Sequence, residues 1–115
     1  MTAVKTDKEM LISVICNDTS RDDEIDDAVM DLSKFDDDEV IQILMIVAND
    51  ASFDHMIRAS AGESLADIWL KRSIIDYTQL GTLTEIPLKE ALAMIKSNRT
   101  DWYTTFSELF PMKVK

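Results

Sequence analysis

Carboxylates are the side chains of this sequence that are best suited to chemistry, and half of them lie in one short segment. Eleven acidic residues lie between Asp18 and Glu39, where only Arg21 and Lys34 oppose them. Carboxylates in such numbers can hold a divalent cation, serve as a general acid and base, or bind a basic partner. Their spacing, and the elements that carry them, decide among these roles.

Neither metal binding nor catalysis fits the spacing of these acids. A calcium loop of the EF-hand type needs ligands at alternating positions around a central glycine, and no glycine lies in this segment. No two carboxylates are set apart from the others, as the acid and base of a catalytic pair would be. We therefore expect no metal site and no cofactor, and an enzyme with an acidic active site is only a third alternative.

The other reactive side chains lack the partners that catalysis requires. His55 is the only histidine, which excludes a zinc site built from several histidines, and we expect it on the surface near the start of a helix. Cys16 has no basic residue or histidine nearby in the sequence to activate it, so we expect a small buried residue. No glycine-rich phosphate loop is present. We predict no catalytic residues.

The composition predicts one small helical domain. The chain has 115 residues, a net charge of −10 and 46% apolar residues, but only two glycines and two prolines. Because a β-sheet protein needs many glycine- and proline-type turns, an all-α fold is favoured. One domain over residues 1–115 is long enough to bury a core. The negative charge argues against nucleic acid as a partner, since phosphate binding relies on Lys and Arg.

The sequence also bears on location. Residues 1–10 carry four charged side chains ahead of a short apolar stretch, unlike a secretory signal. The longest apolar stretch, Val40 to Ala48, is too short to span a membrane. A single cysteine suits reducing conditions. We expect a cytoplasmic protein that makes no membrane contact.

Apolar residues recur at helical spacing along most of the chain. Val40 to Ala48 is apolar nearly all round, so a central helix buried on most sides is expected there, whereas the tail from Met112 to Lys115 is expected to be frayed. Six to eight helices are predicted in all. They cover residues 7–16, 22–34, 40–48, 54–72 and 87–96, with a short helix that ends at Gly81 and a last helix that ends before Pro111.

The first two helical pairs repeat each other at a fixed offset along the chain. Residues 14–18 align with residues 46–50, and Ile25 aligns with Ile57, each seven residues after the aligned Asp. A period of about 30 residues is typical of stacked helical hairpins that share one core. A third pair, over residues 87–110, fits this architecture but not the register.

The second unit has an apolar helix, then Asp50 in a turn, then a helix that carries Arg58 and a run of small residues. Over about residues 41–69 this pattern resembles a HEAT repeat. The resemblance implies stacked antiparallel helical hairpins in which Asp50 and Arg58 are structural. The first unit departs from the pattern, because Asp26 stands where the second unit has Arg58. The small residues would let neighbouring helices approach closely; they are Ala59, Ser60, Ala61 and Ser64.

A dense acidic surface on a small helical stack indicates a binding module for a basic protein, because complementary charge raises association rates and selects partners. Small acidic helical proteins of this profile resemble the immunity proteins of bacterial contact-dependent growth inhibition systems. That resemblance implies a monomer that binds a cognate basic toxin domain, a nuclease whose active site the carboxylates would cover. The residues expected to contact the toxin are Asp22, Asp23, Asp26, Asp27, Asp31, Asp36, Asp37, Asp38, Glu63 and Asp67.

An alternative function would use apolar surface instead. A HEAT-like adaptor or scaffold would dock a helix or another subunit through apolar, Met-rich surface, although Met10, Met45 and Met94 lie in apolar runs and are expected in the core. Adaptor binding would not respond to salt or to the replacement of acids by Ser. Toxin binding would weaken with both.

Overall fold

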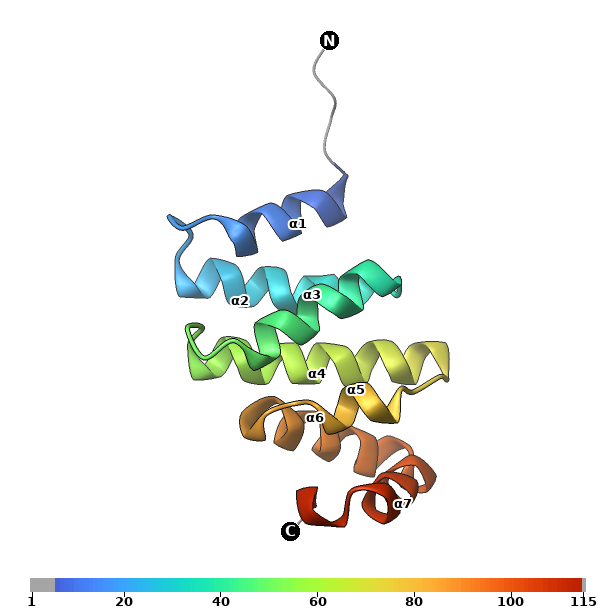
Figure 1. The fold of residues 1–115 in the computed structure, drawn as a ribbon. Helices are drawn as coiled ribbons and strands as arrows, with labels where there is room; N and C mark the ends of the chain where they lie inside the picture. The colour runs from blue at the N-terminus through green and yellow to red at the C-terminus, as the bar shows by residue number, and fades with distance from the viewer. Residues whose placement is uncertain (1–5, 115) are drawn as a thin grey trace.

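The computed structural model describes residues 6–114, which fold into seven α-helices and two 3-10 helices without a strand (Figure 1). The expected all-α fold with six to eight helices is confirmed. Residues 1–5, which belong to the segment expected to hold no secretory signal, lie outside the described residues. The helices are α1 (Asp7–Cys16), α2 (Asp22–Asp31), η1 (Leu32–Lys34), α3 (Asp38–Asn49), α4 (His55–Arg72), α5 (Tyr77–Gly81), α6 (Glu85–Asn98), α7 (Thr100–Leu109) and η2 (Pro111–Lys113).

Three helices, α2, α4 and α6, form the spine of the molecule. Helix α4 packs against both α2 and α6, while α1 packs against α2, α3 against α4, and α7 against α6. Figure 1 shows α1, α2, α4, α6 and α7 as successive rows from blue to red, with α3 running obliquely from the level of α2 to that of α4. The stack is elongated, with extents of 53 × 27 × 20 Å. The central helix is thus α4. The segment Val40 to Ala48, which was expected to be central and buried on most sides, lies in α3, and its Ile46 is 66% exposed.

Small residues on α4 let both neighbouring spine helices approach closely. The Ser64 hydroxyl donates a hydrogen bond to the carbonyl oxygen of Val29 on α2, at 3.1 Å. On the other side, a Cβ added at Gly62 would overlap the backbone of Pro87 on α6. Large side chains at these points would push the helices apart. Of the four small residues expected to allow close packing, Ser60, Ala61 and Ser64 are buried and Ala59 is partly buried.

The Arg58 side chain ties three helices together. Its Nε donates to the carbonyl oxygen of Ala48 in the last turn of α3 at 3.2 Å, and its Nη2 donates to Oγ1 of Thr84 at 2.9 Å, just before α6. Asn49 completes the junction, because its side chain donates to the Thr82 carbonyl and accepts from the Thr84 amide. These contacts agree with the structural role expected for Arg58.

Asp50 acts more locally than Arg58. Its carboxylate accepts hydrogen bonds from the Ser52 amide at 2.9 Å and the Ser52 hydroxyl at 2.7 Å. The Ser52 amide is the main cause that lowers the pKa of Asp50, and the charge of Arg58 lowers it further. Asp50 therefore fixes the turn between α3 and α4, in line with the expected structural role.

Several helix boundaries differ from the prediction. The helix expected over residues 22–34 is α-helical only to Asp31, and its last turn is the tighter η1. Helix α6 starts at Glu85, two residues before Pro87. Proline is tolerated there because the first amides of a helix have no partner within the helix. Helix α3 begins at Asp38 because the Asp37 carboxylate accepts from the Val40 amide and caps it.

Two burial predictions for α1 were wrong. Cys16 is exposed, because the buried side of α1 faces α2 through Ile15 and leaves its last residue outside. Met10 is also 55% exposed, because it borders an open hollow between α1 and the end of α2 instead of entering the core. The other two methionines expected in the core, Met45 and Met94, are half-buried and pack against it.

The C-terminal tail is more ordered than expected. Pro111–Lys113 forms η2, and Val114 packs against the core, so the described part of the tail is not frayed. Lys115 lies outside the described residues.

No helix within residues 6–114 combines the length and the apolar character that a membrane span requires.

Candidate protein-binding surface

The ten carboxylates expected to bind a partner lie in three places. In Figure 1, α2 begins at the left of the molecule and α3 begins at the right. The acids of α2 and α4 lie on two helices that pack against each other, whereas the remaining three stand at the start of α3. The three groups are Asp22, Asp23, Asp26, Asp27 and Asp31 on α2, Asp36, Asp37 and Asp38 at the start of α3, and Glu63 and Asp67 on α4.

Five of these carboxylates pair with a cation of the same chain. Exposed ion pairs contribute at most about 1 kcal/mol each and leave the carboxylate accessible. They also neutralise charge that a partner would otherwise meet. The pairs are Asp23 with Arg21, Asp31 with Lys34, Asp37 with Lys8, Asp38 with Arg72 and Asp67 with Lys71.

The other five make no ion pair with any residue in the described range 6–114. Four of them lie on the two packed spine helices, and only one lies near the start of α3. The unpaired negative charge is therefore concentrated on α2 and α4. These five residues are Asp22, Asp26, Asp27, Asp36 and Glu63.

An open groove lies between α2 and α4, and its acidic lining comes from α4. Met30 and Ser33 line it from the α2 side, Glu63 and Asp67 from α4, and Met94 from α6. Its volume is about 240 Å³. We call the surface formed by this groove and by Asp22, Asp26, Asp27, Glu63 and Asp67 the acidic face. It combines carboxylates with methionine side chains, which suits a partner that is both basic and partly apolar.

Asp26 has the most unusual environment on the acidic face. Its Oδ1 atom is buried but accepts no hydrogen bond from the described residues. A buried acceptor without a donor costs about 1–3 kcal/mol of folding free energy. Arg58, at the matching position of the second unit, makes two hydrogen bonds within the fold. Asp26 thus stands at a position where the described part of the fold offers this oxygen no donor.

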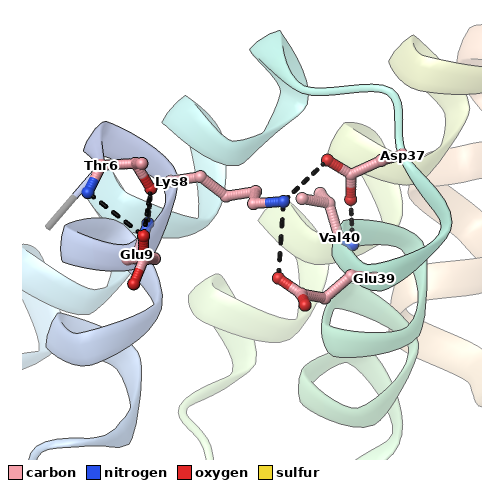
Figure 2. A network of polar contacts seen from close by, with 6 residues as sticks. All are labelled: Thr6, Lys8, Glu9, Asp37, Glu39 and Val40. Carbon is pink, nitrogen blue, oxygen red and sulfur yellow. Dashed lines mark hydrogen bonds and ion pairs between the residues drawn. The ribbon is translucent and has the colours of Figure 1, made fainter.

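Two acids at the start of α3, Asp37 and Glu39, are engaged by the fold itself (Figure 2). Lys8 of α1 donates to Oδ2 of Asp37 at 3.1 Å, and it lies 3.5 Å from Oε1 of Glu39. The second oxygen of Asp37 accepts from the Val40 amide at 2.9 Å. That backbone hydrogen bond is the main cause that lowers the pKa of Asp37, and Lys8 adds to it. The hydrogen bond to Asp37 in turn raises the pKa of Lys8.

This geometry gives Asp37 and Glu39 a structural role. Asp37 caps α3, and Lys8 fastens α1 to the second helical pair. Asp38, whose side chain is 90% exposed, is only loosely paired with Arg72 at 3.7 Å. Of the three acids expected to bind a partner here, Asp36 and Asp38 are the more accessible.

Sequence reasoning missed the methionines of this surface. Met30 is 50% exposed and Met56 is 65% exposed. Met56 precedes Ser60, Glu63 and Asp67 by four, seven and eleven residues, so all four lie on one side of α4. That spacing was the signal that could have found Met56.

The histidine and the possible metal-ligand groups are described for residues 6–114. His55 is exposed at the first position of α4, as expected. In the same range, no group of three or more His, Cys, Asp or Glu side chains is placed to hold a metal ion.

Comparisons with known protein families, with curated proteins and with solved structures found no match to this chain.

Proposed function

We propose that this chain is an immunity protein of the HEAT-like helical kind, which binds a cognate basic toxin domain through its acidic face. The proposal rests on one observation. Asp26, Asp27 and Glu63 lie on two packed helices, α2 and α4, without a cation of the described residues to balance them. Unbalanced negative charge lowers the stability of the free protein, and a basic partner would offset that loss.

The partner chemistry follows from what the acidic face offers. A nuclease holds the phosphates of its substrate with Lys, Arg or His, so a row of carboxylates can occupy the same positions. Met30 and Met94 would supply apolar contact in the groove beside Glu63 and Asp67. The paired acids, such as Asp23 and Asp31, would stand close by, where their exposed ion pairs can be exchanged for pairs with the toxin.

Asp26 supports a binding role over a purely structural one. A residue that leaves a buried oxygen without a donor lowers stability, and such costs gather at functional sites. The second unit has Arg58 at the matching position, where it helps to hold the stack. We therefore propose that the first unit exchanges a stabilising contact for negative charge.

The direct test uses the basic C-terminal domain of a large secreted protein encoded immediately upstream of this chain. We expect that domain to bind with a nanomolar dissociation constant and to lose its activity in the complex. Replacing Asp26, Asp27 and Glu63 by Ser should weaken binding at least tenfold, which corresponds to about 1.4 kcal/mol. Absence of such a domain, or unchanged affinity of the triple variant, would overturn the proposal.

A matched control separates the acidic face from net charge alone. Glu85, Glu90 and Glu108 are exposed acids of α6 and α7 that make no ion pair with the described residues. Replacing these three by Ser changes the net charge by the same amount. The control variant should bind the toxin domain within about twofold of the wild-type affinity if the contact is local.

The alternative is an adaptor that docks a partner helix through apolar surface. The exposed side chains of Met30 and Met56 favour it, because methionine adapts to differently shaped partners. An adaptor of this kind would bind equally well at low and high salt. Replacing Met30 and Met56 by Ser would then weaken binding more than replacing the three acids.

A further inference from the structure

Three lysines at the C-terminal end of the stack make no ion pair with a carboxylate of the described residues. Among residues 6–114, only Arg58, Lys89, Lys96 and Lys113 make no ion pair with a carboxylate, and Arg58 is held by other hydrogen bonds. The remaining three all line one groove. In a chain with 22 acidic residues, this gathering of unpaired cations points to an anionic ligand from outside.

The groove lies between α6 and the segment formed by α7 and η2. Leu88, Leu92 and Val114 supply apolar lining, and its volume is about 430 Å³. It is open to solvent rather than enclosed. Small-molecule sites usually bury about 70–90% of their ligand. An open groove of this kind is better suited to a segment of a protein.

The lysines stand along the groove at a spacing that matches a helix. Lys89 and Lys96 are seven residues apart on α6, two turns or about 10.5 Å along the axis. Lys96 lies over the Tyr103 ring, with its Nζ 5.2 Å from the ring centre, so its charge is held at the groove. Ala93, between the two lysines, leaves room for a close approach.

One carboxylate also lines the groove and restricts the ligand. Glu85 lies one turn before Lys89, at the start of α6, and makes no ion pair with the described residues. An acidic side chain opposite Glu85 would be repelled, whereas one opposite Lys89 or Lys96 would be attracted. The groove is therefore polarised along its length.

We infer that this groove binds an acidic amphipathic helix of a partner protein, with its apolar side against Leu88, Leu92 and Val114 and its carboxylates against the lysines. Such a helix carries apolar anchors at every third or fourth residue and acids seven residues apart. The surface is distinct from the acidic face in position and in charge. It does not depend on the function proposed above.

The test uses a fluorescein-labelled synthetic peptide of five helical turns, or about 18 residues, that presents leucines on one side and glutamates two turns apart beside them. We expect micromolar binding by fluorescence anisotropy. Binding should weaken at least tenfold when Lys89 and Lys96 are both replaced by Glu. A peptide with Lys in place of Glu should not bind. Equal binding of both peptides, or no binding of the acidic one, would overturn the inference.

The matched control replaces Lys34 and Lys71 by Glu, which changes the net charge equally but lies outside the groove. This variant should bind the acidic peptide within about twofold of the wild type, because neither lysine lines the groove. It should also stay folded, because exposed ion pairs such as those of Lys34 and Lys71 contribute little to stability. Circular dichroism checks that both variants are folded. Loss of binding in the control as well would contradict a local site.

Three further measurements decide what occupies the groove. Methyl NMR of Leu88, Leu92 and Val114 should show shifts on addition of the acidic peptide. Vesicles of phosphatidylglycerol and phosphatidylcholine should not sediment the protein, and sedimentation equilibrium at low salt should show a monomer. Binding to the vesicles, or self-association abolished by the Lys89 and Lys96 changes, would assign the groove to a membrane or to a second copy and overturn the inference.

Discussion

Arg58 and Asp26 stand at matching positions of two helical units, but only Arg58 is satisfied by the fold. Arg58 donates to the Ala48 carbonyl at 3.2 Å and to Thr84 Oγ1 at 2.9 Å. Oδ1 of Asp26 is buried and has no hydrogen-bond partner among the described residues. One unit thus uses this position to hold the stack, whereas the other places a carboxylate there.

Replacing Asp26 by Ala should therefore stabilise the protein. The matched control is Asp27→Ala, which brings the same gain in helix propensity at the next, exposed position of α2. Asp26→Ala should exceed it by about 1 kcal/mol in the free energy of unfolding, because it also removes a buried acceptor without a donor. Urea denaturation measures both. If Asp26→Ala is no more stable than Asp27→Ala, its buried oxygen is satisfied in solution.

Replacing Arg58 by Ala should have the opposite effect. The change removes two hydrogen bonds from a charged donor, which together contribute about 2–3 kcal/mol, and it separates the end of α3 from the start of α6. Lys71→Ala serves as the control, because it removes only an exposed ion pair with Asp67. A loss in Arg58→Ala no larger than that of the control would show that the junction is not structural.

The two glycines should differ in their tolerance of a methyl group. In Gly62→Ala the new Cβ would overlap the Pro87 backbone, which cannot turn aside, so we expect a loss of about 2–3 kcal/mol. In Gly81→Ala the Cβ would stand 2.7 Å from the far end of the Phe110 ring, which can rotate away. Thermal unfolding should rank Gly62→Ala well below Gly81→Ala. The reverse order would contradict the close contact of α4 with α6.

Asp37 should make stability depend on pH in acid. Its folded pKa is lowered below the ordinary value of 3.8, chiefly by the Val40 amide. A lowered folded pKa gives stability that is present above pH 3.8 and is lost as the pH falls through the lowered value. Asp37→Ala should cost about 1 kcal/mol at pH 7, as removal of a helix cap does, and less at pH 2. Urea denaturation at both pH values measures the difference.

Asp36→Ala is the control for Asp37, because Asp36 is exposed and has no partner among the described residues. It should change stability by less than about 0.5 kcal/mol at pH 7. A cost of Asp37→Ala that is the same at pH 7 and pH 2 would contradict the role given to its ionised form.

The helices could be predicted from sequence because their signals are local. The bounds of α1 matched the prediction, and α4 was placed within one residue, because the apolar periodicity lies within each segment and a Thr or Asp cap directly precedes it. The exposure of Cys16 and Ile46 could not be predicted in the same way. Which side of a helix is covered depends on what packs on it, and α1 and α3 each pack mainly against one neighbour.

The two candidate surfaces also differ in how far they could be predicted from the sequence. The acidic residues were visible because they are close together in the sequence, but the sequence could not show that Lys8 engages Asp37 and Glu39 from another helical pair. The groove lined by three lysines was not predicted from the sequence at all. Its cations, Lys89 and Lys96 on α6 and Lys113 on η2, come from segments that no local pattern links.

The central claim is that unpaired carboxylates of the acidic face bind a basic toxin domain. Its most direct test is the dissociation constant for the upstream-encoded domain, measured between about 50 and about 300 mM salt by titration calorimetry, for the wild type and for the variant with Asp26, Asp27 and Glu63 replaced by Ser. We predict that wild-type affinity falls steeply with salt and that the variant is weaker at low salt with a shallower dependence. Equal affinity and equal salt dependence of the two proteins would contradict the account.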